Sequence, residues 1–177
     1  MYIWVAIDVD EQVSELREYA EGYVRGHGLS SPTLTLPFHI SLKISFEIPD
    51  EKRVEVTRYI RDIFKTLKPF EIPVGRVEKN GLILWLTIGE SAELASIHNR
   101  LDELMLEKYG VTEHEFDKAF IFHTSILILN SEEQICRAQD AIKAVNIPST
   151  LVAKKIIIGS SESGRAGTYI VDEEIVL

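Results

Sequence analysis

Two histidines in this sequence are each followed, two residues later, by a serine inside an apolar segment. The segments are Phe38-His39-Ile40-Ser41-Leu42 and Phe122-His123-Thr124-Ser125-Ile126. If each segment is a β-strand, alternation of side chains places its histidine and its serine on one face. An imidazole titrates near neutral pH, and a hydroxyl beside it can bind phosphoryl oxygens. The pair of motifs therefore predicts acid–base chemistry on a phosphodiester.

The remaining three histidines lack this pattern. His27, His98 and His114 are followed at the same spacing by Leu29, Arg100 and Phe116. A single His-x-Ser motif is explained better by a histidine packed in a core than by a functional one. Two such motifs in apolar strands, at equivalent places in the chain, favour a functional pair.

The elements that must position the motifs follow from hydrophobic periodicity. Alternation predicts strands at residues 2–9, 36–47, 70–78, 82–88 and 119–129, and two last strands on either side of the loop 160–167. Helical spacing predicts helices at residues 10–25, after Pro49-Asp50, after Ser91 and from Ser131 to about Val145. Asp10 is expected to cap the first helix, Asn80-Gly81 to form a hairpin turn, and Ser131 to Gln134 to form a capping box.

The order of these elements is β-α-β-α-β followed by β-α-β-α-β-β, with one histidine strand at the centre of each half. The distance along the chain from Trp4 to His39 is also close to that from Trp85 to His123. We therefore predict an α+β fold formed by a single domain, residues 1–177. Its two lobes, approximately the halves 1–79 and 80–177, should be related by a pseudo-two-fold axis and should enclose a central cleft.

Composition limits the class of ligand. The 177 residues carry a formal net charge of −9, which disfavours extended binding to nucleic acid, because such binding depends on Lys and Arg neutralising phosphates. A small nucleotide or one RNA end remains compatible. No signal sequence or membrane-spanning segment is recognised, so we expect a cytoplasmic protein without a membrane partner. Cys136 is the single cysteine and is expected to be a buried structural thiol.

Other chemistries find no support in the motifs. The sequence has neither the His-Glu-x-x-His pattern nor Cys/His spacings typical of metal sites. It also has no glycine loop of the Walker or dinucleotide-binding type. We therefore expect neither a metal nor another cofactor.

The chain resembles the 2H phosphoesterase superfamily, in particular its LigT-like branch of RNA 2′,3′-cyclic phosphodiesterases and 2′-5′ RNA ligases. The resemblance rests on both histidine motifs, on the opening strand 1–8 and on the closing pattern from Ile158-Gly159-Ser160-Ser161 through Gly167-Thr168-Tyr169. It implies a bilobal fold of largely antiparallel sheets with the motifs facing each other. LigT-like motifs usually have Thr where this chain has Ser41 and Ser125, and many have Pro where it has Phe122.

The resemblance implies catalytic roles for His39 and His123, and phosphate binding by Ser41 and Ser125. From the residues alone, Lys43 continues the predicted face of His39 and is a further candidate phosphate ligand. Arg165, in the loop beside Tyr169, is another. Substrate contacts are expected from Trp4 and Tyr169, whereas Phe38 and Phe122 alternate away from the histidines and should pack in the core.

The leading hypothesis is a metal-independent phosphodiesterase that hydrolyses a 2′,3′-cyclic phosphate or a 2′-5′ phosphodiester, with possible reversible ligase activity. One alternative is a nucleotide- or RNA-end-binding module of the same fold without significant catalysis. Another is a phosphodiesterase for a non-RNA cyclic phosphate, such as an ADP-ribose derivative. The sequence leaves open the oligomeric state, and which histidine is the acid and which the base.

Overall fold

The computed structural model describes residues 1–114 and 116–177. Its strands are β1 (Tyr2–Asp8), β2 (His39–Glu47), β3 (Phe70–Asn80), β4 (Ile83–Ile88), β5 (His123–Ile128), β6 (Thr150–Ala153), β7 (Lys155–Ser161) and β8 (Ile170–Val176). Its α-helices are α1 (Ser14–Gly26), α2 (Arg53–Phe64), α3 (Ala92–Tyr109) and α4 (Glu132–Ala141). Short 3₁₀ turns precede several of these elements, among them Asp10–Val13 and Asp117–Ala119.

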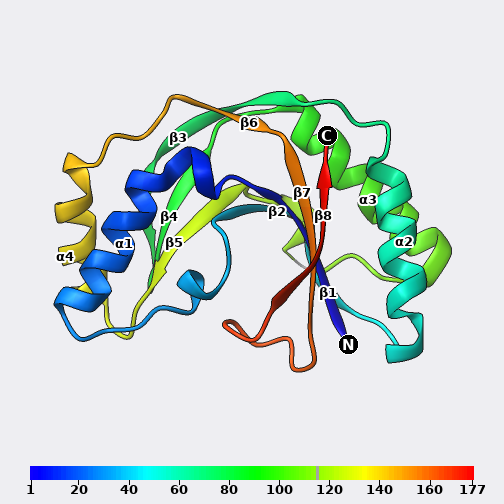
Figure 1. The fold of residues 1–177 in the computed structure, drawn as a ribbon, viewed down its shortest axis with the longest axis horizontal. Coiled ribbons are helices and arrows are strands. Elements are labelled where there is room, and N and C mark those ends of the chain that lie inside the picture. Colours follow the sequence, from blue (N-terminus) through cyan, green and yellow to red (C-terminus); the bar gives the residue numbers. More distant parts are fainter. Residues whose placement is uncertain (115) are drawn as a thin grey trace.

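The strands form two antiparallel sheets of four strands each. The first sheet has the order β2-β1-β7-β8 and the second has the order β5-β4-β3-β6. Figure 1 shows α2 and α3 beside the first sheet, and α1 and α4 at the opposite end of the molecule beside the second. The predicted α+β class with antiparallel sheets is confirmed.

The two sheets exchange elements between the halves of the sequence. Helix α1 follows β1 in the chain but contacts β5, and α3 follows β4 but contacts β2. Strand β3 joins the second sheet, and β7 and β8 return to the first. We call each sheet, together with the helices beside it, a lobe. Each lobe contains elements from both halves of the sequence, so the division between residues 79 and 80 does not separate the two sheets.

Strand β1 shows how the sequence pattern divides the core. Ile3, Val5 and Ile7 are fully buried in the main core, together with side chains of the helices that cover the sheets. On the opposite face, Trp4 and Ala6 form a small second cluster with Ile157 of β7. The alternation predicted for this strand therefore separates a helix-covered face from a face that carries the candidate site.

Most of the predicted turns and caps are present. Gly81 has φ +57° in the β3–β4 hairpin, a backbone conformation that glycine adopts without strain. Ser91 accepts a hydrogen bond from the amide of Leu94, and Ser131 from that of Gln134. The prediction that Asp10 caps the first helix is wrong, because no side chain caps the N-terminus of α1. The carboxylate of Asp10 instead accepts hydrogen bonds from the amide of Phe38 and from Nη1 of Arg17.

Two further expectations differ from the structure. Strand β6 was not predicted; its four residues are separated from β7 only by Lys154. Cys136 is exposed rather than buried, and its sulfur lies 3.7 Å from the ammonium of Lys79. Among the described residues, no helix combines the length and the apolar composition that crossing a membrane requires.

Candidate active site

His39 and His123 are the first residues of β2 and β5, and both imidazoles are partly buried. In each ring, Nδ1 bonds to the backbone carbonyl two residues earlier, at 2.8 Å to Pro37 and 2.7 Å to Ile121. Because a carbonyl oxygen only accepts, we assign the proton to Nδ1 in both neutral rings. Each Nε2 is then left unprotonated, and its lone pair can accept a proton in general base catalysis.

The surroundings of both imidazoles favour the neutral form. Burial lowers the pKa of His39, and the hydrogen bond to Pro37 only partly offsets this effect. The nearby charge of His123 lowers the pKa of His39 further, whereas Asp8 raises it. Burial also lowers the pKa of His123, against the hydrogen bond to Ile121. The charge of a protonated His123 therefore opposes protonation of His39.

Each motif serine lies on the same face as its histidine, as predicted for a strand. In the β1–β2 pair Ser41 is opposite Ala6, and in the β4–β5 pair Ser125 is opposite Trp85. Both serines are partly exposed. Within residues 1–114 and 116–177, neither hydroxyl makes a side-chain hydrogen bond, so both are available to a ligand oxygen.

An indole ring lies against each imidazole. The ring centre of Trp4 is 4.6 Å from that of His39, and the ring centre of Trp85 is 4.3 Å from that of His123. The strand register nevertheless shows that the two tryptophans are not equivalent, because Ala6 is the residue opposite Ser41. Trp85 was not predicted as a site residue, although its spacing from His123 was the available signal.

A β-bulge follows each motif serine and changes the face of the next side chain. On β2, Ser41 is opposite Ala6 and Lys43 is opposite Val5, so Leu42 is the extra residue. On β5, Ser125 is opposite Trp85 and Leu127 is opposite Leu84, so Ile126 is the extra residue. The bulge turns Lys43 onto the face of Val5, which is covered by α3, and away from His39.

Lys43 is accordingly buried among acidic side chains rather than placed beside a phosphate. Its ammonium is ion-paired with Asp102 of α3 and lies 3.2 Å from Asp117. The side chain of Lys43 is 1% exposed and that of Asp117 is not exposed at all. The expectation that Lys43 continues the face of His39 is therefore wrong, and we leave Lys43 out of the proposed ligand contacts.

The same cluster contains residue types that bind metals. His98, Asp102 and Asp117 bring one potential ligand atom each within 4.8 Å of the others. The ammonium of Lys43, however, already contacts both carboxylates, and Nδ1 of His98 is hydrogen-bonded to the carbonyl of Leu42 at 2.8 Å. These groups are thus explained as a buried ionic network that joins β2 to α3.

The remaining candidates lie around Trp4. Tyr169 packs edge-on against Trp4 at 6.2 Å between ring centres, and its hydroxyl donates to the carbonyl of Gly164. Arg165 is exposed in the same loop. Trp4 is only 5% exposed and so offers little surface to a ligand. Phe38 is buried in the core as predicted.

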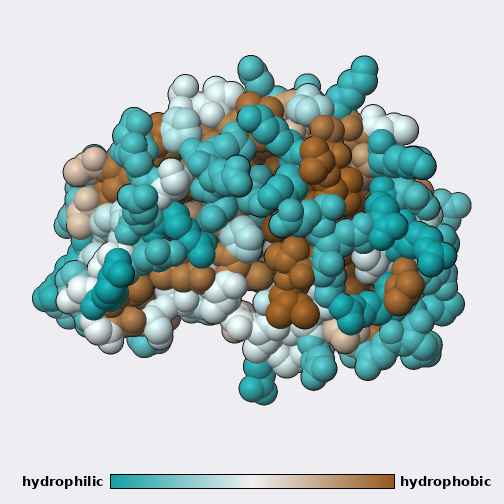
Figure 2. Space-filling view, in the orientation of Figure 1, coloured by the Kyte–Doolittle hydropathy of each residue, from teal (hydrophilic) through white to brown (hydrophobic). Residues whose placement is uncertain are grey.

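Figure 2 shows the outline of the molecule hollowed at its lower edge. In the same orientation in Figure 1, the loop before β2 and the loop between β7 and β8 lie on either side of this hollow. The second of these loops carries Arg165 and leads to Tyr169. The arrangement therefore offers two Nε2 atoms and two hydroxyls on β2 and β5, with Arg165 in a loop at the edge.

A family model described as the 2′-5′ RNA ligase superfamily matches residues 5–165. The chain belongs to this superfamily. The resemblance to LigT-like 2H phosphoesterases is thereby confirmed. Comparison with curated proteins gives no match.

Solved structures show the same fold across nearly the whole chain. E. coli LigT complexed with 3′-AMP has a TM-score of 0.62 at 19% identity, covering 99% of this chain and 97% of that one. TT0787 of Thermus thermophilus has a TM-score of 0.66 at 16% identity, covering 100% and 98%. Usb1 of Kluyveromyces marxianus has a TM-score of 0.53 at 12% identity, covering 99% and 98%. Superfamily membership indicates phosphoesterase- or ligase-type activity on RNA or nucleotides.

Proposed function

We propose that the protein is a metal-independent phosphodiesterase that hydrolyses 2′,3′-cyclic phosphates, or 2′-5′ phosphodiesters, at RNA ends or in small nucleotides. The observation that carries the proposal is the matched pair of imidazoles, each with Nδ1 bonded to a backbone carbonyl, which leaves Nε2 unprotonated in the neutral ring. General acid–base catalysis needs one such atom without a proton and one with it.

In this mechanism, the neutral imidazole accepts a proton from water through Nε2 as the water oxygen attacks phosphorus. The bond from phosphorus to one ribose oxygen breaks, and the protonated second imidazole donates its proton to that oxygen. The first imidazole has then gained a proton and the second has lost one. Proton exchange with solvent returns both imidazoles to their starting protonation states. By resemblance to LigT-like enzymes, the 3′ oxygen is released and a 2′-phosphate remains.

Ser41 and Ser125 are proposed to donate hydrogen bonds to the nonbridging phosphoryl oxygens. Their hydroxyls lie beside the histidines on the same face, so they would meet charge that builds on these oxygens in the transition state. Arg165 is a proposed additional phosphate contact from its exposed loop. Tyr169 is a proposed contact for the nucleoside, and Trp4 contributes mainly by packing against His39.

Small substrates are favoured by the charge distribution. The chain has a net charge of −9, and Lys43 is turned away from the site. The solved structures of E. coli LigT hold 3′-AMP in one case and NADP⁺ in another. We therefore expect a mononucleoside 2′,3′-cyclic phosphate to be a substrate in its own right.

The test is incubation of the protein with 2′,3′-cyclic nucleotides in the presence of EDTA, followed by ³¹P NMR of the products. We expect conversion to a 2′-phosphate that EDTA does not inhibit and that His39→Ala abolishes. Binding without turnover, unchanged in His39→Ala, would support a non-catalytic binding module instead. Turnover of an oligonucleotide end, but not of the mononucleotide, would show that RNA length is recognised.

A further inference from the structure

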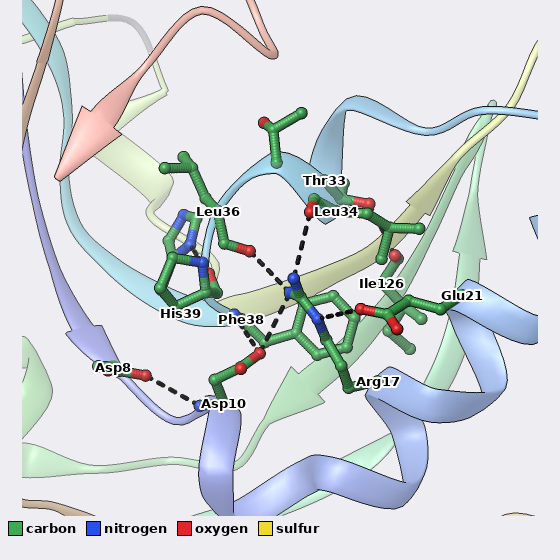
Figure 3. Close-up of polar contacts among 12 residues, drawn as sticks. Asp8, Asp10, Arg17, Glu21, Thr33, Leu34, Leu36, Phe38, His39 and Ile126 are labelled. Atoms are coloured by element: carbon green, nitrogen blue, oxygen red, sulfur yellow. Dashed lines mark hydrogen bonds and ion pairs between the residues drawn. The ribbon is translucent and has the colours of Figure 1, made fainter.

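Arg17 of α1 contacts the segment that leads into His39. Figure 3 shows its guanidinium among the backbone groups of this segment. Nη1 donates to the carbonyl of Leu36 at 2.7 Å, and Nη2 donates to that of Leu34 at 3.1 Å. The guanidinium carbon also lies 5.0 Å from the ring centre of Phe38. One largely buried side chain, 20% exposed, therefore holds several of the residues directly before His39.

Arg17 binds the residue before Pro37, and Asp10 binds the residue after it. Its carboxylate accepts the amide hydrogen of Phe38 at 2.8 Å and a hydrogen from Nη1 of Arg17 at 3.2 Å. The backbone is thus fixed on both sides of Pro37, whose ring further restricts its φ angle. The carbonyl of Pro37 is the group that accepts the proton of His39 Nδ1. Its direction is therefore set by the Arg17–Asp10 pair.

Helix α1, which carries Arg17, is attached to the other lobe. The hydroxyls of Tyr19 and Tyr23 donate to backbone carbonyls of α4 at 2.6 and 3.1 Å, and α1 contacts β5. The segment before His39 is bound to the same lobe directly, because the hydroxyl of Thr33 donates to the carbonyl of Ile126 at 2.7 Å. Arg17 therefore joins the approach to one histidine to the lobe that contains the other.

We infer that Arg17 is a positioning residue for the reaction, which acts through the backbone at residues 34–38 to orient the imidazole of His39 and to place it relative to His123. This inference rests on the proposed function. Arg17 itself reaches neither imidazole, so its contribution is the orientation of Nε2 toward the reacting phosphorus. A misplacement of about 1 Å in such a group can lower the rate about 100-fold.

The test compares Arg17→Ala and Arg17→Lys with the wild type on a 2′,3′-cyclic nucleotide. We expect kcat to fall about 10- to 100-fold in both variants, with KM little changed. Lysine keeps the charge but cannot span two carbonyls and a carboxylate with one ammonium, so it should not restore the rate. Added methylguanidinium should restore part of kcat in Arg17→Ala.

Two control variants separate this role from general effects on α1. Glu21→Gln removes the negative charge of the side chain that accepts a hydrogen bond from Arg17 Nε at 2.9 Å. Arg25→Ala removes an exposed arginine from the last turn of the same helix. Both controls should retain the kcat of the wild type. A comparable loss of kcat in either of them would overturn the assignment to Arg17.

A second readout does not depend on turnover. The ¹⁵N NMR signals of His39 should report the Nδ1–H tautomer in the wild type and a mixture of tautomers in Arg17→Lys and in Thr33→Val. These two variants carry the test even if Arg17→Ala does not fold. Folded variants with an unchanged His39 tautomer and unchanged kcat would refute the positioning role. A wild type without turnover would refute the proposed function, whereas the tautomer would still test Arg17.

Discussion

The approaches to the two histidine strands differ far more than the strands themselves. Before His39, the backbone is held by Arg17 and Asp10, and Phe38 is 1% exposed. Before His123, the equivalent Phe122 is only partly buried and Ile121 is 60% exposed, although the carbonyl of Ile121 makes the same bond to the imidazole as that of Pro37 does. The fold therefore repeats the motif geometry but supports the two copies unequally, and we expect His39 to be the more firmly oriented.

The core-facing sides of the two histidine strands differ as well. The bulge after Ser41 turns the charged side chain of Lys43 inward, and the bulge after Ser125 turns Leu127 inward. Lys43 meets Asp102 and Asp117, whereas Leu127 lies in the apolar core. Equivalent backbone positions thus contain an ionic network in one lobe and hydrophobic packing in the other.

The largest effect should come from removing either catalytic imidazole. Each proton transfer contributes about 10²- to 10⁴-fold, so His39→Ala and His123→Ala should each lower kcat by this amount. The two variants should differ on a p-nitrophenyl phosphodiester, whose leaving group needs no proton. Only the variant that lacks the general acid should recover activity on this substrate. Equal recovery in both would contradict a division of labour between the histidines.

The contrast between Lys43 and Leu127 predicts unequal losses of stability. Lys43→Met leaves the buried carboxylate of Asp117 and the partly buried carboxylate of Asp102 without their cation. It should lower the free energy of unfolding by about 3–5 kcal/mol. Leu127→Met nearly conserves the volume of an apolar side chain and should cost less than about 1.5 kcal/mol. Denaturant titration measures both values.

Combining Lys43→Met with Asp102→Asn and Asp117→Asn should recover much of the stability lost in the single variant, because the uncompensated charges are removed. At a temperature at which Lys43→Met is folded, its kcat should be close to that of the wild type. A large increase in KM without a loss of stability would instead indicate that Lys43 contacts the phosphate.

The pH profile should reflect the lowered pKa of both histidines. The free enzyme is active when one imidazole is protonated and the other is neutral, and at pH 8 both are neutral. As pH falls from about 8 to about 6.5, the protonated fraction of the imidazoles increases and kcat/KM should rise, by at most about tenfold per pH unit. Because burial lowers the pKa of both histidines, the rise should continue below about pH 6.5. A profile that falls over this interval would contradict the proposed acid–base pair.

An NMR titration can separate the two members of this pair. In His123→Gln, the pKa of His39 should rise toward its ordinary value, because the opposing charge of His123 has been removed. It should stay below that value, since burial is the larger cause of the shift.

The smallest effect concerns the residue between histidine and serine. Thr124 is fully buried and its hydroxyl has no hydrogen-bond partner among the described residues, whereas the equivalent Ile40 is buried and apolar. An unsatisfied buried polar group is destabilising, so Thr124→Val should raise the free energy of unfolding by about 1 kcal/mol. Ile40→Val should lower it by about 0.5–1.5 kcal/mol, because it leaves a small cavity. Thermal or denaturant unfolding of both variants tests these opposite signs.

Sequence periodicity was sufficient for the parts of the fold that depend on local patterns. It located both histidine strands, the Asn80-Gly81 turn and the cap at Ser131, because each depends on neighbouring residues. The alternation rule also placed Ser41 on the face of His39. The same rule failed two residues later at Lys43, because a bulge inserts a residue without a recognisable signal in the sequence.

The contacts that hold the segment before His39 could not be predicted from the sequence, for a different reason. Asp10 precedes a helix and matches the pattern of an N-cap, yet its carboxylate binds Phe38 and Arg17. The contact with Phe38 joins residues 28 positions apart in the chain, and local propensity contains no information about it. The exchange of α1 and α3 between the lobes was missed for the same reason.

The strand order also has a consequence for how the chain reaches its native state. Strand β1 lies between β2 and β7, and it contains five consecutive buried residues. It ends at Asp8, but β7 does not begin until Lys155, so one edge of β1 stays unpaired until most of the chain has been synthesised. Contacts between residues so distant in the chain slow folding, and an exposed apolar edge promotes aggregation. The sheet that carries His39 should therefore be completed last, and chaperones that shield β1 should increase the yield of active protein.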